Sequence, residues 1–290
     1  MMLETKPTKS LDRRLHAYRP DLADARLVGK VEAEHFVEGE AGAVAAPVAD
    51  LRPRPDLSAG IDTQLLMGEP LRIFDRAEGW AWVQAETDGY VGYIAEAEIV
   101  SPAQQVTHWI VQPRSFVYPE PDMKRPRGSA LSLGSRVSII GEAETRGTRY
   151  GLLAGGGAVI AAHCAPLGAP ATNDYVAMGA RLLETPYLWG GKSAFGIDCS
   201  GLVQLCMMMA GMSAPRDSDM QAAGLGREIG FDELRRGDLV FWKGHAAIME
   251  DGETMIHANG HTMSVAREGL KAAVQRIGYL YGAPTVCRRP

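Results

Sequence analysis

The sequence predicts a multidomain fold in which two small β-barrels precede an α+β domain. An internal repeat, which aligns Leu51 with Val117, fills the first part of the chain, and one helical pattern followed by three strand patterns fills the last. With 290 residues the chain is long enough for several cores. We expect a partly helical lead-in over 1–45, barrels over 46–103 and 104–168, and the α+β domain over 169–290.

The composition excludes several function classes. The 30 Lys and Arg residues are outnumbered by 35 Asp and Glu, and no basic block is long enough to follow a phosphate backbone, so no nucleic-acid partner is expected. No apolar run reaches the roughly 18 residues of a membrane span, and the charged N-terminus lacks the apolar core of a signal peptide. Four scattered cysteines make no disulfide framework. We therefore expect a cytoplasmic protein without a membrane partner.

The repeat is clearest in a Pro-x-Pro-Asp segment. Residues 51–57 read L-R-P-R-P-D-L, and residues 117–123 read V-Y-P-E-P-D-M. Short alternating runs broken by Pro and Gly predict a small antiparallel barrel in each copy. With the G-Y-V-G-Y segment at 89–93, the two copies resemble bacterial SH3 (SH3b) domains. Taken alone, such barrels are typical of spacers or wall-binding modules.

The two copies differ at two polar positions. Glu69 of the first copy corresponds to Ser135 of the second, and Tyr90 corresponds to Gly156. If only the first barrel contributes to a functional site, Glu69 and Tyr90 are the residues that we expect it to contribute.

A buried helix is predicted to begin at a cysteine. Apolar residues at 199, 202, 203, 206 and 210 follow helical spacing, and Gly211 is a plausible stop. Cys199 then lies in the first turn, where unpaired N–H groups and the helix dipole lower a thiol pKa and favour a nucleophile. The alternative is a small buried hydrophobic residue, which is how we interpret Cys206.

Strand patterns occur at 239–242, 245–249 and 255–258. Together they predict a meander, which would place His245 and His257 on neighbouring strands. A helix packed on this sheet can bring the thiol of the cysteine to the imidazole of His245. A cysteine, a histidine and a third group that orients the histidine are the general form of a thiol-hydrolase triad. A further histidine follows His257 by four positions, but Asn-Gly between them argues against a helix, so we expect no metal site.

The order of four motifs identifies a family resemblance. D-C-S-G-L, R-R-G-D-L-V-F-W, G-H-A-A-I-M and M-I-H-A occur in this order, and the region 175–285 is similar to the NlpC/P60 family of cell-wall cysteine peptidases, which implies a papain-like α+β fold. Two SH3b domains ahead of such a domain resemble the γ-D-glutamyl-L-diamino acid endopeptidases, which act on wall peptides with a free N-terminal L-Ala.

The resemblance implies a role for each matching residue. Cys199 would be the nucleophile and His245 the general base, while His257 would orient His245. Tyr187 would help to stabilise the oxyanion, together with the backbone N–H of Cys199, and the alternative for Tyr187 is a core aromatic residue.

The resemblance also implies a pocket for the substrate's α-amine, formed by Asp198, Glu69 and Tyr90. Two carboxylates and a phenol suit a cation. Asp198 could instead be the helix N-cap, or serve both purposes, and Glu69 could be a solvated turn residue. Further candidates, for the D-Glu carboxylate and the peptide backbone, are Ser200, Arg216, Asp217 and Ser218.

The expected reaction is hydrolysis of the bond between γ-D-Glu and a diamino acid in murein peptides, during peptidoglycan turnover or recycling, without a cofactor. Two alternatives stay open: a murein-peptide-binding protein with an inactive catalytic domain, and a cell-wall hydrolase of broader specificity. Related thiol acyltransferases that act on lipids place histidine before cysteine, whereas here Cys199 precedes His245, which disfavours transfer.

Overall fold

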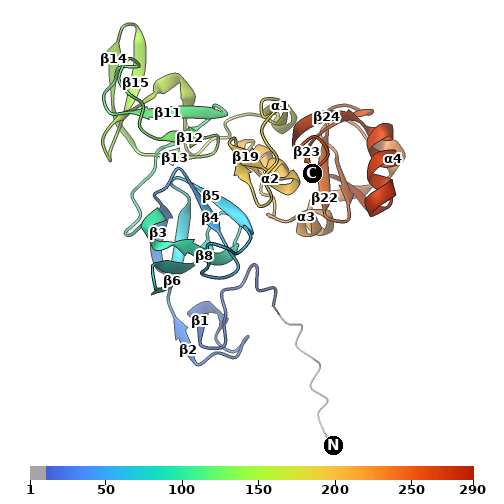
Figure 1. Cartoon of the computed structure of the whole chain (residues 1–290), viewed down its shortest axis with the longest axis horizontal. Helices are drawn as coiled ribbons and strands as arrows, with labels where there is room; N and C mark the ends of the chain where they lie inside the picture. Colours follow the sequence, from blue (N-terminus) through green and yellow to red (C-terminus); the bar gives the residue numbers. More distant parts are fainter. Residues whose placement is uncertain (1–10) are drawn as a thin grey trace, which may run out of the picture.

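The computed structural model describes residues 11–290, which form two β units and a larger α+β domain (Figure 1). The first ten residues of the predicted lead-in lie outside the described residues. Of the helix expected in the rest, only the 3₁₀ turn η1 (Ala25–Leu27) is present. It lies between β1 (Leu22–Asp24) and β2 (His35–Val37), which pair in parallel. An extended segment forms because its apolar side chains cover the aromatic pair Phe74 and Trp82 of the first β unit.

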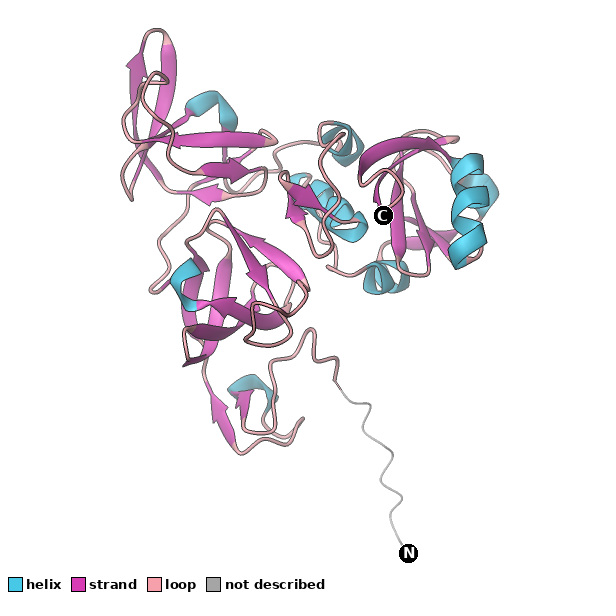
Figure 2. Ribbon diagram, viewed as in Figure 1, coloured by secondary structure: helices cyan, strands magenta, loops and turns pink. Residues whose placement is uncertain are grey.

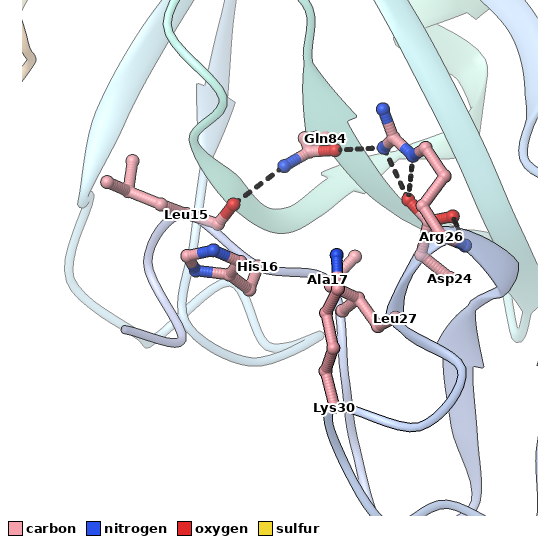
Figure 3. A pocket seen from close by; sticks show the side chains of 8 residues that line it. All are labelled: Leu15, His16, Ala17, Asp24, Arg26, Leu27, Lys30 and Gln84. Carbon is pink, nitrogen blue, oxygen red and sulfur yellow. Dashed lines mark hydrogen bonds and ion pairs between the residues drawn. The ribbon is translucent and has the colours of Figure 1, made fainter. Parts of the chain in front are cut away.

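Polar contacts also join the lead-in to the first β unit (Figure 3). The amide of Gln84 donates to the carbonyl of Leu15 at 2.9 Å and accepts from Arg26 at 2.6 Å. Asp24 in turn accepts from Nε of Arg26 at 2.6 Å. These residues line a cavity of about 200 Å³. The lead-in is therefore packed onto the first β unit.

The first β unit begins earlier than position 46. Strand β3 lies within the predicted lead-in, yet it pairs with β6 and β9 of one five-stranded sheet, while β4 and β5 form a hairpin. The strands are β3 (Glu40–Val44), β4 (Val48–Leu51), β5 (Thr63–Leu66), β6 (Pro70–Ala77), β7 (Trp80–Ala85), β8 (Val91–Ala95) and β9 (Ile99–Val100), with the 3₁₀ turn η2 (Glu96–Glu98) before β9.

The second β unit repeats this order at the offset that aligns Leu51 with Val117. The pair Gly42 and Leu71 of β3 and β6 recurs as His108 and Val137 of β10 and β13. The strands are β10 (His108–Ile110), β11 (Arg114–Tyr118), β12 (Ala130–Ser132), β13 (Arg136–Val137), β14 (Ile139–Thr145), β15 (Thr148–Leu153), β16 (Ala158–Ile160) and β17 (Cys164–Pro166), with η3 (Ala161–His163) before β17.

The α+β domain is built on a six-stranded sheet in the order β20-β25-β21-β22-β23-β24. The predicted helix and all three predicted strands are present. The elements are α1 (Tyr175–Ala180), β18 (Lys192–Ser193), β19 (Gly196–Ile197), α2 (Cys199–Met209), α3 (Ser218–Gly224), β20 (Arg227–Ile229), η4 (Phe231–Glu233), β21 (Leu239–Trp242), β22 (His245–Met249), β23 (Thr254–Asn259), β24 (Ser264–Gly269), α4 (Leu270–Tyr281) and β25 (Val286–Arg289).

Successive side chains of strand β21 point to opposite faces of the sheet, and both faces are apolar. Leu239 and Phe241 pack in one core with α2, whereas Val240 and Trp242 pack in another with α4. The two helices accordingly lie on opposite sides of the sheet (Figure 2). None of the helices in residues 11–290 has the length and apolar character needed to cross a membrane.

Helix α2 is the centre of a core that all three parts share. Ten of its eleven residues are buried. Leu66 of the first β unit and Leu133 of the second belong to the same apolar cluster as Leu202 and Leu205 of α2. The helix is thus enclosed by its own sheet and by side chains from both β units.

A buried ion pair joins the first β unit to the α+β domain. Nζ of Lys192 lies 2.9 Å from Oε1 of Glu69, and the side chains are 1% and 0% exposed. The backbone N–H of Lys192 also donates to Gln64 at 3.2 Å. Because neither charge can be hydrated, each depends on the other.

We predict that Lys192→Met lowers the free energy of unfolding by about 3–5 kcal/mol, because it leaves Glu69 charged and unpaired in the interior. The double variant Lys192→Met/Glu69→Leu should recover most of this loss. Urea unfolding at neutral pH, followed by tryptophan fluorescence, measures both. Arg149→Met, which breaks an exposed ion pair with Glu142, is the control and should leave the transition unchanged. An equally unchanged transition in Lys192→Met would contradict the prediction.

Candidate active site

The predicted nucleophile lies where helix α2 begins. Asp198 is the N-cap, and its Oδ1 accepts from the backbone N–H of Gly201 at 2.6 Å. Cys199 is therefore the first helical residue, and it is only 6% exposed. Its Sγ lies 3.9 Å from the carbonyl oxygen of Gly244, in the turn just before His245. The fold thus brings the thiol to the beginning of strand β22.

The two histidines form a hydrogen-bonded pair on neighbouring strands. Nε2 of His245 lies 2.9 Å from Nδ1 of His257, and the ring of His257 is fully buried. This contact leaves Nδ1 of His245 as the nitrogen available to the thiol. Burial above all, and then the positive charge that His257 would carry, lowers the pKa of His245 to about 3, so the ring is neutral at pH 7 and can accept a proton.

The prediction that the pKa of the Cys199 thiol is lowered is wrong for the substrate-free protein. Burial, followed by the negative charge of Asp198, raises the pKa of Cys199 to about 12. Backbone N–H groups and the Arg216 guanidinium act in the opposite direction, but they do not outweigh the loss of hydration. The resting pair is accordingly a neutral thiol beside a neutral imidazole, and the proton must move as the sulfur attacks.

Tyr187 lies close to the nucleophile. It forms a parallel bridge with Ile197, which comes shortly before Cys199, and is partly buried. Burial raises its pKa, and the nearby charges of Cys199 and Asp198 raise it further, so the phenol stays protonated and can donate a hydrogen bond. Its role at the oxyanion stays a prediction.

Asp198 and Arg216 are bound to each other rather than directed at a substrate. The Arg216 guanidinium is 1% exposed and binds both carboxylate oxygens of Asp198, at 3.0 and 2.7 Å. It also donates to Ser200 Oγ at 2.9 Å and to Thr63 Oγ1 at 2.6 Å. Asp198 is therefore the helix N-cap, as one of the two interpretations had it. The predicted grip of Arg216 on a substrate carboxylate is wrong, because its three nitrogens already have protein partners.

Glu69 is likewise bound by other residues of the protein. Its carboxylate is fully buried against Lys192 and accepts from the backbone N–H of Leu66 at 3.3 Å. A carboxylate that is neutralised and sealed in this way cannot receive a substrate amine. The prediction that Glu69 lines the amine pocket is corrected for this reason: it is a contact between domains.

Tyr90 does reach the α+β domain. Its hydroxyl donates to Oδ2 of Asp217 at 3.0 Å, and the same oxygen accepts from Arg14 of the lead-in at 2.8 Å. Ser218, the first residue of α3, follows directly and is half-buried. Of the substrate-binding candidates, Tyr90 and Asp217 are thus brought together at the border of the first β unit.

Asp62, which the sequence reasoning missed, also lies at this border. It is half-buried, and burial followed by the charge of Asp217 raises its pKa. It immediately precedes Thr63, which binds Arg216. The comparison of the two repeat copies could have identified it. At the offset of the repeat Asp62 corresponds to Gly128, so this carboxylate, like Glu69, occurs only in the first copy.

No cluster of His, Cys, Asp and Glu that could hold a metal ion occurs within residues 11–290. The groups that gather at the beginning of β22 are side chains with acid–base and nucleophilic chemistry. A thiol at a helix N-terminus, beside a neutral histidine that a second histidine holds, defines a cysteine hydrolase.

Comparisons with known proteins specify this class. Residues 184–276 match the family model of the NlpC/P60 family, and residues 51–99 match that of the bacterial dipeptidyl-peptidase SH3 domain. Residues 184–276 therefore form an NlpC/P60 cysteine peptidase domain, and an SH3-like domain precedes it.

Two relatives and one solved structure match along much of the chain. Dipeptidyl-peptidase 6 of Lysinibacillus sphaericus is 28% identical over 82% of this chain and 98% of its own length. A γ-D-glutamyl-L-lysine dipeptidyl-peptidase of Bacillus cereus is 26% identical over 68% of this chain and 67% of its own. The crystal structure of an NlpC/P60 family protein from Bacillus cereus covers 86% of this chain and 99% of its own at 22% identity, with a TM-score of 0.71, and thus shares the fold.

We predict that alkylation of Cys199 by iodoacetamide accelerates about tenfold per pH unit between about pH 6 and 9, without a plateau. The raised pKa of Cys199 means that the thiolate is a small and growing fraction throughout this range. Mass spectrometry of the Cys199 peptide measures the rate, and Cys206, which is fully buried, serves as an internal control. A rate that stays constant from about pH 5 to 8 would instead indicate a preformed thiolate–imidazolium pair.

Proposed function

We propose that this cysteine peptidase hydrolyses the γ-D-glutamyl bond to a diamino acid in murein peptides that carry a free N-terminal L-Ala. The observation that carries the proposal is the arrangement of Cys199, His245 and His257 in an NlpC/P60 domain, with an SH3-like domain packed against it. The similarity to dipeptidyl-peptidase 6, which extends over 98% of that relative, supports a peptidase, and the similarity to a γ-D-glutamyl-L-lysine dipeptidyl-peptidase supports the bond assignment.

In the first half-reaction, Sγ of Cys199 attacks the γ-carbonyl carbon of D-Glu while its proton moves to Nδ1 of His245. The carbonyl oxygen becomes an oxyanion, which the Tyr187 hydroxyl and the backbone N–H of Cys199 stabilise by hydrogen bonds. His245 then gives its proton to the departing amine of the diamino acid. The C–N bond breaks, and a thioester to Cys199 remains.

In the second half-reaction, a water molecule attacks the thioester carbonyl and His245 accepts its proton. The C–S bond breaks, L-Ala-γ-D-Glu leaves, and the proton on His245 returns to Cys199. Because the resting imidazole is neutral, the same ring can accept a proton in each half-reaction.

We infer that Asp62 supplies the carboxylate of the amine pocket, beside Tyr90 and beside Asp217, which already binds Arg14. Two observations support this set: the hydroxyl of Tyr90 donates to Asp217, and the pKa of Asp62 is raised by burial and by Asp217. A carboxylate in these surroundings gains from an added cation, and an ammonium supplies both the charge and three donors. An acylated amine would leave Asp62 unpaired and would be selected against.

We also propose that the second β unit is an SH3-like barrel and that the α+β domain is papain-like. The repeat supports the former, since the pair Val48 and Leu66 of β4 and β5 recurs as Arg114 and Ser132 of β11 and β12 at the same offset. A reducing compartment such as the cytoplasm is the proposed location, supported by four free cysteines. Fractionation of cells that express the chain tests the location.

We predict that the protein releases L-Ala-γ-D-Glu from L-Ala-γ-D-Glu-meso-diaminopimelate and leaves the N-acetylated peptide intact. Mass spectrometry of the products measures this, and Cys199→Ala, which lacks the nucleophile, should release nothing. Equal cleavage of both peptides would favour a hydrolase of broader specificity. Binding without cleavage of either peptide would favour a binding protein with an inactive domain. The L-Lys peptide, run in parallel, reports the diamino acid preference.

Asp62→Asn should reduce kcat/KM for the free-amine peptide about 10- to 100-fold, since a hydrogen bond to a charged group contributes roughly 1.5–3 kcal/mol. Glu78→Gln is the matched control: it removes one carboxylate charge at the exposed turn between β6 and β7 and should change nothing. If Asp62→Asn retained full kcat/KM, the pocket assignment would be wrong while the bond assignment would stand.

A further inference from the structure

Two charged residues that the proposed reaction does not use lie directly behind His257. Oε2 of Glu268, on β24, is 3.1 Å from Nε2 of His257. The carboxylate of Glu268 is held by Arg276 of α4, which donates from Nε to Oε1 at 2.9 Å and from a terminal nitrogen to Oε2 at 2.6 Å. A row of polar groups therefore runs from His245 through His257 and Glu268 to Arg276, across three strands and one helix.

The contact between the two histidines fixes how their protons must be distributed. Only one hydrogen lies between Nε2 of His245 and Nδ1 of His257, which are 2.9 Å apart. A neutral imidazole carries one N–H. If His245 is to accept the thiol proton at Nδ1, its own hydrogen must be on Nε2 and must be donated to His257. Nδ1 of His257 is then an acceptor, and the hydrogen of His257 must be on Nε2.

Nε2 of His257 consequently needs an acceptor, and the carboxylate of Glu268 lies 3.1 Å from it. An ionised carboxylate only accepts hydrogen bonds, so it favours the tautomer of His257 that carries its hydrogen on Nε2. The opposite tautomer would donate from Nδ1 of His257 to His245. That arrangement would move the hydrogen of His245 to Nδ1, where it would face the thiol and block proton transfer.

Arg276 keeps Glu268 in the required form. Its paired hydrogen bonds orient the carboxylate and lower the pKa of Glu268, so the side chain stays ionised in neutral solution. The contact from Glu268 to His257 is within hydrogen-bonding distance but does not have the geometry of a hydrogen bond, which requires a rotation of the ring or of the carboxylate to form.

We propose that Glu268, held by Arg276, is a positioning residue that keeps His257 in the Nε2–H tautomer and thereby leaves Nδ1 of His245 free to accept the proton of Cys199. The inference rests on the proposed cysteine-peptidase chemistry. It adds to the triad a carboxylate that touches neither the substrate nor the reacting sulfur.

A double-mutant cycle tests the proposal through kcat for the murein tripeptide. Glu268→Leu should lower kcat about 100-fold in the otherwise unchanged protein, since loss of the correct tautomer costs catalysis without removing the triad. In a His257→Asn background, the side chain has no counterpart of Nε2 that Glu268 could bind, so Glu268 can no longer determine which group faces His245. There, Glu268→Leu should cost less than about twofold. Equal fold losses in both backgrounds would overturn the proposal.

A matched control separates positioning from stability. Glu250 forms the same kind of paired ion contact with Arg267, and the side chains of Glu250 and Glu268 are 20% and 21% exposed. Glu250→Leu therefore removes an equivalent ion pair without touching either catalytic histidine. It should leave kcat unchanged. A loss of kcat in Glu250→Leu comparable to that in Glu268→Leu would assign the effect to general stability and overturn the proposal.

A substrate-free measurement keeps this inference separate from the proposed function. The ¹⁵N shifts of histidine rings in the Cys199→Ala protein report the tautomer of His257 directly. We expect a protonated Nε2 in this protein and a protonated Nδ1, or a mixture of the two, once Glu268→Leu is added. An unchanged His257 tautomer would overturn the proposal even if the murein peptide were cleaved, and a changed one would support it even if the true substrate were different.

Discussion

The buried pair of Arg216 and Asp198 is the interaction on which the rest of the site depends. Arg216 joins the N-cap of the catalytic helix to the first β unit, because the same guanidinium binds Asp198, Ser200 and Thr63. Both charges are nearly sealed from water, so removal of either partner would leave the other buried without its hydrogen-bonded counterion. The position of Cys199 is therefore set by a residue that is distant in the sequence and by a hydroxyl from another domain.

The sequence allowed correct predictions where the structure depends on residues that are close together in the chain. The apolar spacing from Cys199, and the three short strands after Leu239, could be predicted because a helix and a meander impose periods on neighbouring residues. These elements bring Cys199, His245 and His257 together. The internal repeat is also visible in the strand pairing, since residues related by its offset pair in the same way in both β units.

The predictions failed where a side chain depends on a distant partner. Nothing near Glu69 indicates that Lys192, far along the chain in another domain, neutralises it. The hydrogen bonds of Arg216 to Thr63, and of Tyr90 to Asp217, likewise cross between domains. The raised pKa of the catalytic thiol has the same origin: the helix dipole is a local property, but burial is decided by everything that packs around the helix.

The enclosure of α2 by Leu66 and Leu133 has a consequence for how the protein is made. During synthesis the two β units leave the ribosome before the catalytic helix does, and domains generally fold in that order. The helix then meets a surface that has already formed, instead of having to collapse with it. On this view the β units act as an intramolecular template for the hydrolase, and chain order is itself part of the folding mechanism.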